Sequence, residues 1–113
     1  LNMKPYTTLE EALASRKPGK RGYTLLDGEN GCTNGCRCGV SVYDNTEFPP
    51  DYGAHEDQEG FYVLEGEGTA RLGDLEIDIK PGDAFVALAG VKHTIKCKMA
   101  DRPVKVLWFH SAV

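Results

Sequence analysis

From Tyr23 onward the sequence is a succession of short apolar runs, each ended within a few residues by glycine, proline, aspartate or asparagine. Runs of this length separated by turn residues predict strands, and their close spacing is typical of an all-β sandwich or barrel. Eight strands are expected, at residues 23–26, 36–43, 60–64, 69–72, 75–79, 84–88, 94–98 and 104–109. So many strands in one short segment favour a compact barrel.

The strands are expected to differ in how they are covered. The pair Gly73-Asp74 forms the turn of a β-hairpin, and the alternating residues 75–79 that follow predict a strand with one wet face. Residues 61–64 and 106–109 are apolar at successive positions, which predicts strands covered on both faces. Tyr62 is therefore expected to pack in the core.

A short helix precedes the strands. Thr8 followed by Glu11 forms a capping box, and residues 17–19, Lys-Pro-Gly, end the helix. Three apolar residues share one helical face: Leu9, Ala12 and Leu13. We therefore expect an N-terminal extension with a short helix at residues 1–22, and a β-barrel domain at residues 23–113.

Composition narrows the range of partners. The chain has 113 residues, which is the size of one domain, and its 13 basic and 17 acidic residues give a formal net charge of -4. Because the basic residues are scattered, nucleic acid is not an expected partner. No apolar run approaches the roughly 20 residues of a membrane-spanning helix, and the polar start does not have the pattern of a secretory leader. These features predict a cytoplasmic protein with no membrane partner.

A possible metal site follows from two histidines and a carboxylate. His55 and Glu59 are separated by an even number of positions, so an extended chain would project both side chains to one face, and another strand could bring His93 opposite them. Imidazole and carboxylate ligands together suit iron, manganese, zinc, nickel or cobalt. The alternative is that all three are solvated loop residues.

The same residues carry a family resemblance. His55, three residues, Glu59 and then Tyr-Val-Leu before a glycine are similar to the first cupin motif, while residues 81–93, from Pro-Gly-Asp to His93, are similar to the second. The chain thus resembles a small single-domain cupin over about residues 36–110. This resemblance implies a double-stranded β-helix, the cupin jelly-roll barrel, with a divalent metal ion inside and frequently a homodimer.

The resemblance also implies the ligands. It assigns metal binding to His55, Glu59 and His93, but the first histidine of the usual pair is replaced by Gly53. Asp57 has the parity to replace that ligand, although the family pattern places it in the turn before Glu59. Two histidines and one carboxylate are the set used by non-haem Fe(II) oxygenases, with positions open for substrate and dioxygen.

We therefore predict a small metal-binding cupin that acts on an unknown small organic substrate, with Fe, Mn, Zn or Ni as cofactor. Oxygenase chemistry at a two-His-one-Glu site is the first hypothesis. The alternatives are a metal-dependent isomerase, lyase or decarboxylase, and a non-enzymatic barrel that binds or senses a small molecule.

The remaining candidate residues are expected to be structural. Cys32, Cys36 and Cys38 are spaced as CxxxCxC, so a structural zinc would need Cys97 or a histidine as its fourth ligand. Buried free thiols that act as small apolar residues are favoured instead, with the last three cysteines facing inward. A thiol that is redox-active or that lies near the metal without binding it is the other possibility. His110 ends an apolar strand and could approach the metal, but at the rim of the sheet beside Ser111 it is expected to be solvated and not to be a ligand.

Overall fold

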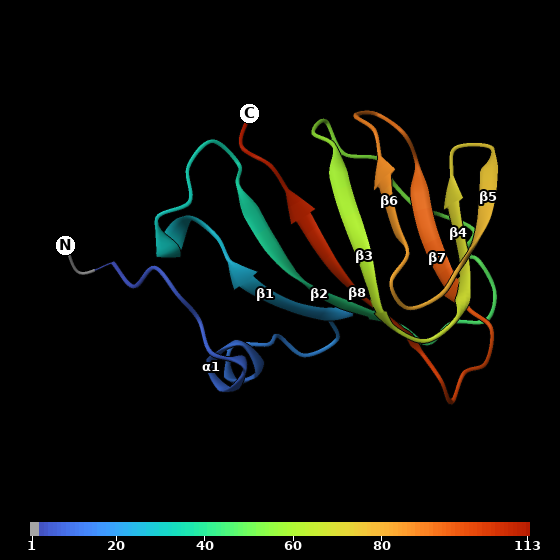
Figure 1. The fold of residues 1–113 in the computed structure, drawn as a ribbon, viewed down its shortest axis with the longest axis horizontal. Coiled ribbons are helices and arrows are strands. Elements are labelled where there is room, and N and C mark those ends of the chain that lie inside the picture. The colour runs from blue at the N-terminus through green and yellow to red at the C-terminus, as the bar shows by residue number, and fades with distance from the viewer. Residues whose placement is uncertain (1–2) are drawn as a thin grey trace.

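A computed structural model describes residues 3–113, which form one short helix and eight strands (Figure 1). All eight expected strands are present, so this prediction is confirmed. The elements are α1 (Leu9–Ala14), β1 (Gly22–Leu26), a 3-10 turn (Gly28–Asn30), β2 (Arg37–Tyr43), β3 (Glu59–Glu65), β4 (Gly68–Leu72), β5 (Leu75–Ile79), β6 (Ala84–Ala87), β7 (His93–Cys97) and β8 (Val104–His110).

The strands form two antiparallel sheets that enclose the core. One sheet has the order β1-β2-β8-β3-β6 and the other the order β5-β4-β7. Their inner faces supply the central cluster of buried side chains, which includes Phe61, Val63, Ala70, Ile95 and Val106. Figure 1 shows the strands of the smaller sheet beside β3 and β6, which is the arrangement of a jelly roll. The expected all-β double-stranded β-helix is therefore confirmed.

A turn in the second motif is tied directly to the first motif. Gly82 has a φ of 94°, and the Asp83 amide donates to the Lys80 carbonyl over 3.0 Å, which closes the turn between β5 and β6. The Gly82 amide also donates to the Val63 carbonyl at 3.0 Å, and the Val63 amide donates to the Asp83 carbonyl at 2.9 Å. These bonds hold the turn against β3, the strand that begins with Glu59.

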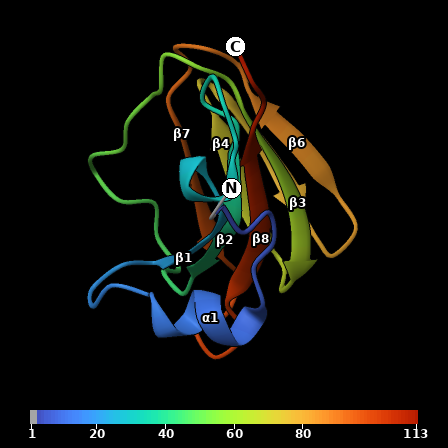
Figure 2. The ribbon, with the colours of Figure 1, turned by 90° about the vertical axis from the view of Figure 1, so that its left-hand side faces the viewer.

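The outer face of the larger sheet differs from the prediction. Phe61 and Val63 are buried, but the alternate residue Tyr62 is 44% exposed, and Leu64 and Phe109 are exposed as well. The expectation that both apolar strands are covered on both faces is therefore wrong. Because α1 packs near β1, at the far edge of the sheet, it leaves the outer side of β3 and β6 uncovered (Figure 2).

The helix has the expected cap but a smaller apolar contact. The Glu11 amide donates to Oγ1 of Thr8 at 3.2 Å, and the Thr8 amide donates to Oε1 of Glu11 at 3.3 Å, which completes the capping box. Of the three apolar residues, only Ala12 is buried, whereas Leu9 and Leu13 are exposed. The division at residue 22 remains a prediction, and residues 1–2 of the proposed extension lie outside the described part of the chain.

The four cysteines are free thiols with different surroundings. Cys97 lies in the core, as predicted, whereas Cys38 pairs opposite the exposed Phe109 on the outer face of its sheet. The inward orientation expected for Cys38 is therefore wrong. Cys36 is half-buried and precedes β2. Within residues 3–113, no helix combines the length and the apolar character needed to cross a membrane.

Candidate metal centre

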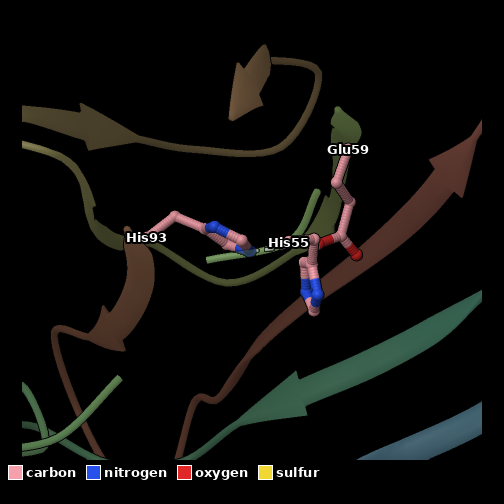
Figure 3. A group of neighbouring side chains, drawn as sticks. All are labelled: His55, Glu59 and His93. Carbon is pink, nitrogen blue, oxygen red and sulfur yellow. Dashed lines mark hydrogen bonds and ion pairs between the residues drawn. The ribbon is translucent and has the colours of Figure 1, made fainter. Parts of the chain in front are cut away.

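Three segments bring His55, Glu59 and His93 together at one end of the barrel. Glu59 is the first residue of β3 in the larger sheet, His93 is the first residue of β7 in the smaller sheet, and His55 lies in the loop before β3. One ligand atom from each residue lies within 4.8 Å of the others. Figure 3 shows the side chains directed toward one another.

The Glu59 carboxylate is the centre of this group. Its Oε1 atom lies 3.0 Å from Nε2 of His93 and 3.4 Å from Nε2 of His55. Glu59 is only 8% exposed and His93 is largely buried, but the His55 side chain is 49% exposed. The group therefore has one open side, where His55 faces the solvent.

Backbone hydrogen bonds between the two motifs place the histidines. The Gly90 amide donates to the His55 carbonyl over 2.8 Å, and the His93 amide donates to the Gly53 carbonyl over 3.2 Å. The chain between His55 and Glu59 bends at residues 56–57 instead of running extended. The structure brings His55 and Glu59 together, but through this bend and these bonds and not through the strand parity that the prediction relied on.

The orientation of the His93 ring is fixed from both sides. Its Nδ1 atom lies 3.1 Å from the Val91 carbonyl, to which it donates, and this leaves Nε2 facing Glu59. The hydrogen bond with Glu59 raises the pKa of His93 above its ordinary value, although burial opposes the shift. The Glu59 carboxylate favours a positive charge at this position. A metal cation would therefore find a nitrogen ligand and a carboxylate ligand already side by side.

His110 is a neighbour of the site that the sequence prediction considered and rejected. It is 4% exposed, and its Nε2 atom lies 3.4 Å from Oε2 of Glu59. The expectation that it is solvated is wrong, because β8 continues to His110 and pairs it with Arg37 of β2. The signal was present in the sequence, since His110 has the same parity in its strand as the buried Val104 and Val106.

Asp57 does not replace the missing ligand but contacts His110. Its Oδ2 atom lies 2.9 Å from Nδ1 of His110 and 3.3 Å from Nη1 of Arg37. The Nδ1 contact is close enough for an ion pair, but its direction is not that of a well-aligned hydrogen bond. Desolvation alone would raise the pKa of Asp57. Hydrogen bonding and the nearby His110 and Arg37 outweigh it and hold that pKa below its ordinary value.

The donor set and its surroundings fit a divalent metal ion. Two imidazoles and a carboxylate are suitable ligands for iron, manganese, zinc or nickel, and they already converge. A side chain at Gly53 would meet no other atom within 4 Å of its Cβ, so the position of the missing histidine is open space. The cavity of about 580 Å³ near Glu65 and Arg102 is a separate feature, because it lies at the opposite end of β3 and is not lined by His55, Glu59 or His93.

Comparisons with known proteins agree with the fold. A family model described as "Cupin domain" matches residues 40–110. A cupin protein from Bacteroides fragilis is similar over 98% of this chain and 87% of its own, with 18% identity and a TM-score of 0.67. The cupin domain of Schizosaccharomyces pombe Cnp3 is similar over 81% of this chain and 60% of its own, with 15% identity and a TM-score of 0.68.

An enzyme also has a similar fold. Hydroxypropylphosphonic acid epoxidase from S. wedmorenis, solved in complex with fosfomycin, matches 80% of this chain with 18% identity and a TM-score of 0.64. This chain spans 50% of the length of that enzyme. The epoxidase has also been solved in an iron(II) form with substrate. No curated protein matches the sequence.

Proposed function

The chain belongs to the cupin domain family, and from this premise we propose that it binds one divalent metal ion through His55, Glu59 and His93 and acts on a small organic substrate. The observation that carries the proposal is the convergence of their ligand atoms within 4.8 Å. Glu59 is buried beside two imidazoles. Burial of a charged carboxylate lowers the stability of the fold unless the carboxylate is paired or binds a metal.

Oxygenase chemistry is the reaction class we favour. A bound iron(II) ion would supply Lewis acidity and a site for dioxygen, because three protein ligands leave octahedral positions open. The similar fold of an epoxidase with an iron(II) form supports iron as the first metal to test. In this chain, Glu59 would provide the negative charge, while the Val91 carbonyl would hold His93 in the tautomer that binds metal.

The site is aromatic on the side that faces the core and open on the other side. The Phe61 ring lies 5.7 Å from the His93 ring and stacks on Phe85 at 4.8 Å, so one wall beside the ligands is aromatic. The exposed His55 marks the side from which a small molecule would reach the ligands.

Nitric oxide binding tests the oxygenase proposal without a known substrate. Nitric oxide replaces dioxygen at an open position of iron(II), so the iron-loaded protein should give a high-spin iron-nitrosyl signal in electron paramagnetic resonance. His93→Ala should abolish this signal. Stable iron binding with no nitrosyl signal would contradict the oxygenase and would favour isomerase, lyase or decarboxylase chemistry; a metal-free protein that binds a metabolite would indicate a non-enzymatic barrel.

We also propose that the chain forms a homodimer through the outer face of β3 and β6. The exposed apolar residues on this part of the chain are Tyr62, Leu64, Val86, Leu88 and Phe109. Several of them line a groove of about 520 Å³. A contiguous apolar patch rimmed by polar residues is typical of a protein interface.

A further inference from the structure

We propose that His110 is a fourth protein ligand, supplied by β8 in place of the imidazole that the first motif lacks at Gly53. The inference rests on the proposed metal site and concerns its composition. Neither motif contains this residue: it lies 17 positions after His93, at the end of the last strand. Its position in the fold, and not its position in a motif, brings it to the site.

All three histidines of the chain turn the same ring atom toward one carboxylate. Nε2 of His55 and Nε2 of His93 face Oε1 of Glu59, whereas Nε2 of His110 faces Oε2 at 3.4 Å. The ring centroids of His55 and His110 are 5.6 Å apart, close to the 5.2 Å between His55 and His93. The three imidazoles therefore surround Glu59 on different sides.

The other nitrogen of His110 has the partner expected of a metal-binding histidine. Such a histidine almost always donates its second ring N–H to a carboxylate or a carbonyl, which fixes the tautomer and leaves the first nitrogen free for the metal. His93 has this arrangement through the Val91 carbonyl. His110 has a carboxylate in the corresponding place, because Oδ2 of Asp57 lies 2.9 Å from Nδ1, although the direction of this contact is that of an ion pair and not of a well-aligned hydrogen bond.

Burial and charge support the same assignment. His110 is 4% exposed, so its two ring nitrogens require partners inside the protein. The charge of Asp57 is balanced by Arg37, 3.3 Å away, and β2 holds Arg37 directly opposite His110. A residue that served only to fill space would not need this pair of charges behind its ring.

One adjustment is required for His110 to bind. It lies outside the group whose ligand atoms are all within 4.8 Å, because its Nε2 atom faces Oε2 of Glu59, whereas the Nε2 atoms of His55 and His93 face Oε1 and are separated from it. Rotation of the Glu59 carboxylate would remove this separation, whereas His110 is held in place by the pairing of β8 with β2. Octahedral coordination has about six positions, so four protein ligands would leave about two of them open.

Proton NMR of the cobalt(II)-substituted protein tests the inference. Each imidazole bound through Nε2 contributes one strongly shifted, solvent-exchangeable Nδ1–H signal, so His110→Ala should lose one such signal relative to the wild type. The His93 side chain is 13% exposed and Nδ1 of His110 is buried, so their Nδ1 protons should exchange slowly enough to be observed. His110→Gln, which keeps a polar side chain of similar size, should lose the same signal and provides a second variant if alanine prevents folding.

The outcomes separate this inference from the proposed function. Cobalt affinity should fall in either variant by at least the roughly 10–100-fold that loss of a residue supporting a ligand costs. If the wild type binds cobalt and the variants retain every shifted N–H signal, His110 is not a ligand and the inference is overturned while the three-residue site stands. If the wild type binds no cobalt, the metal site itself is overturned, and the inference with it.

Discussion

Nε2 of His93 lies 3.0 Å from Oε1 of Glu59, although the two residues are 34 positions apart in the sequence. Glu59 begins a strand of the larger sheet and His93 begins a strand of the smaller sheet. The contact therefore joins the two walls of the barrel at its open end. A metal ion bound to both residues would strengthen a connection that the fold already makes.

Replacement of Glu59 by glutamine should greatly reduce metal affinity. The amide keeps the size of the side chain but removes the negative charge that all three imidazoles face. Loss of a residue that only supports a ligand costs about 10–100-fold in affinity, so loss of a ligand should cost at least as much. Calorimetric titration with cobalt(II) would measure the change.

Glu65→Gln is the matched control for that variant. Glu65 ends the same strand, and its side chain is 69% exposed at the opposite end from the site. It should bind cobalt as the wild type does. Equal affinities for both variants would show that the charge of Glu59 does not contribute to binding.

Removal of the charge on Asp83 should change how stability depends on pH. Hydrogen bonds from the Lys80 side chain and amide hold the pKa of Asp83 below its ordinary value of 3.8. The charged carboxylate therefore stabilises the fold above that value, and this contribution is lost as the pH falls through the lower folded-state pKa. Asp83→Asn should lower the melting temperature at neutral pH.

The pH profile distinguishes this effect from a general loss of packing. The difference between Asp83→Asn and the wild type should shrink as the pH falls below 3.8, where the unfolded wild-type chain takes up the proton, and should vanish below the lower folded-state pKa, where the folded carboxylate is protonated too. Thermal melts monitored by circular dichroism between neutral and acidic pH would measure it. A constant difference across this range would disprove the electrostatic explanation.

Two glycines of the first motif region should respond differently to alanine. Gly66 has a φ of 82°, and an added Cβ would collide with the Pro103 carbonyl oxygen, which is backbone and cannot move away easily. Gly53 has open space around the same position. Gly66→Ala should therefore destabilise the fold by at least about 1 kcal/mol, whereas Gly53→Ala should stay within about 0.5 kcal/mol of the wild type.

Chemical denaturation would measure both glycine variants under the same conditions. The result expected is a lower denaturation midpoint for Gly66→Ala alone. A large loss for Gly53→Ala would contradict the open space around Gly53 in the loop beside the proposed metal ligands.

A charge on the outer face of β6 should prevent dimer formation. Val86 lies in the exposed apolar patch, across Gly60 from Phe109, so Val86→Lys would place an ammonium group in the proposed interface. Light scattering coupled to size exclusion should show a dimer for the wild type and a monomer for this variant. Leu75→Lys, at an exposed position in the smaller sheet, should remain dimeric.

The sequence predicted the features that depend on neighbouring residues. Strands, the Gly73-Asp74 turn and the Thr8 cap depend on short patterns, and each appears in the structure. The surroundings of Tyr62 could not be predicted in this way, because the cover over a sheet face depends on where a distant helix packs.

The candidate site was only partly predictable for the same reason. The motif resemblance identified His55, Glu59 and His93, which the structure brings together. His110 belongs to no motif and reaches Glu59 only because β8 lies between β2 and β3 in the sheet. Asp57 was assigned to a turn correctly, but its contact with His110 required knowledge of that strand order.

Metal content is the most direct test of the central claim that His55, Glu59 and His93 bind a divalent ion. The apoprotein should be reconstituted anaerobically with iron(II), freed of unbound metal by gel filtration and measured by elemental analysis, with His93→Ala treated in parallel. We predict close to one iron per wild-type chain and almost none in the variant. Retention of no metal by the wild type, or of equal amounts by both proteins, would contradict the claim.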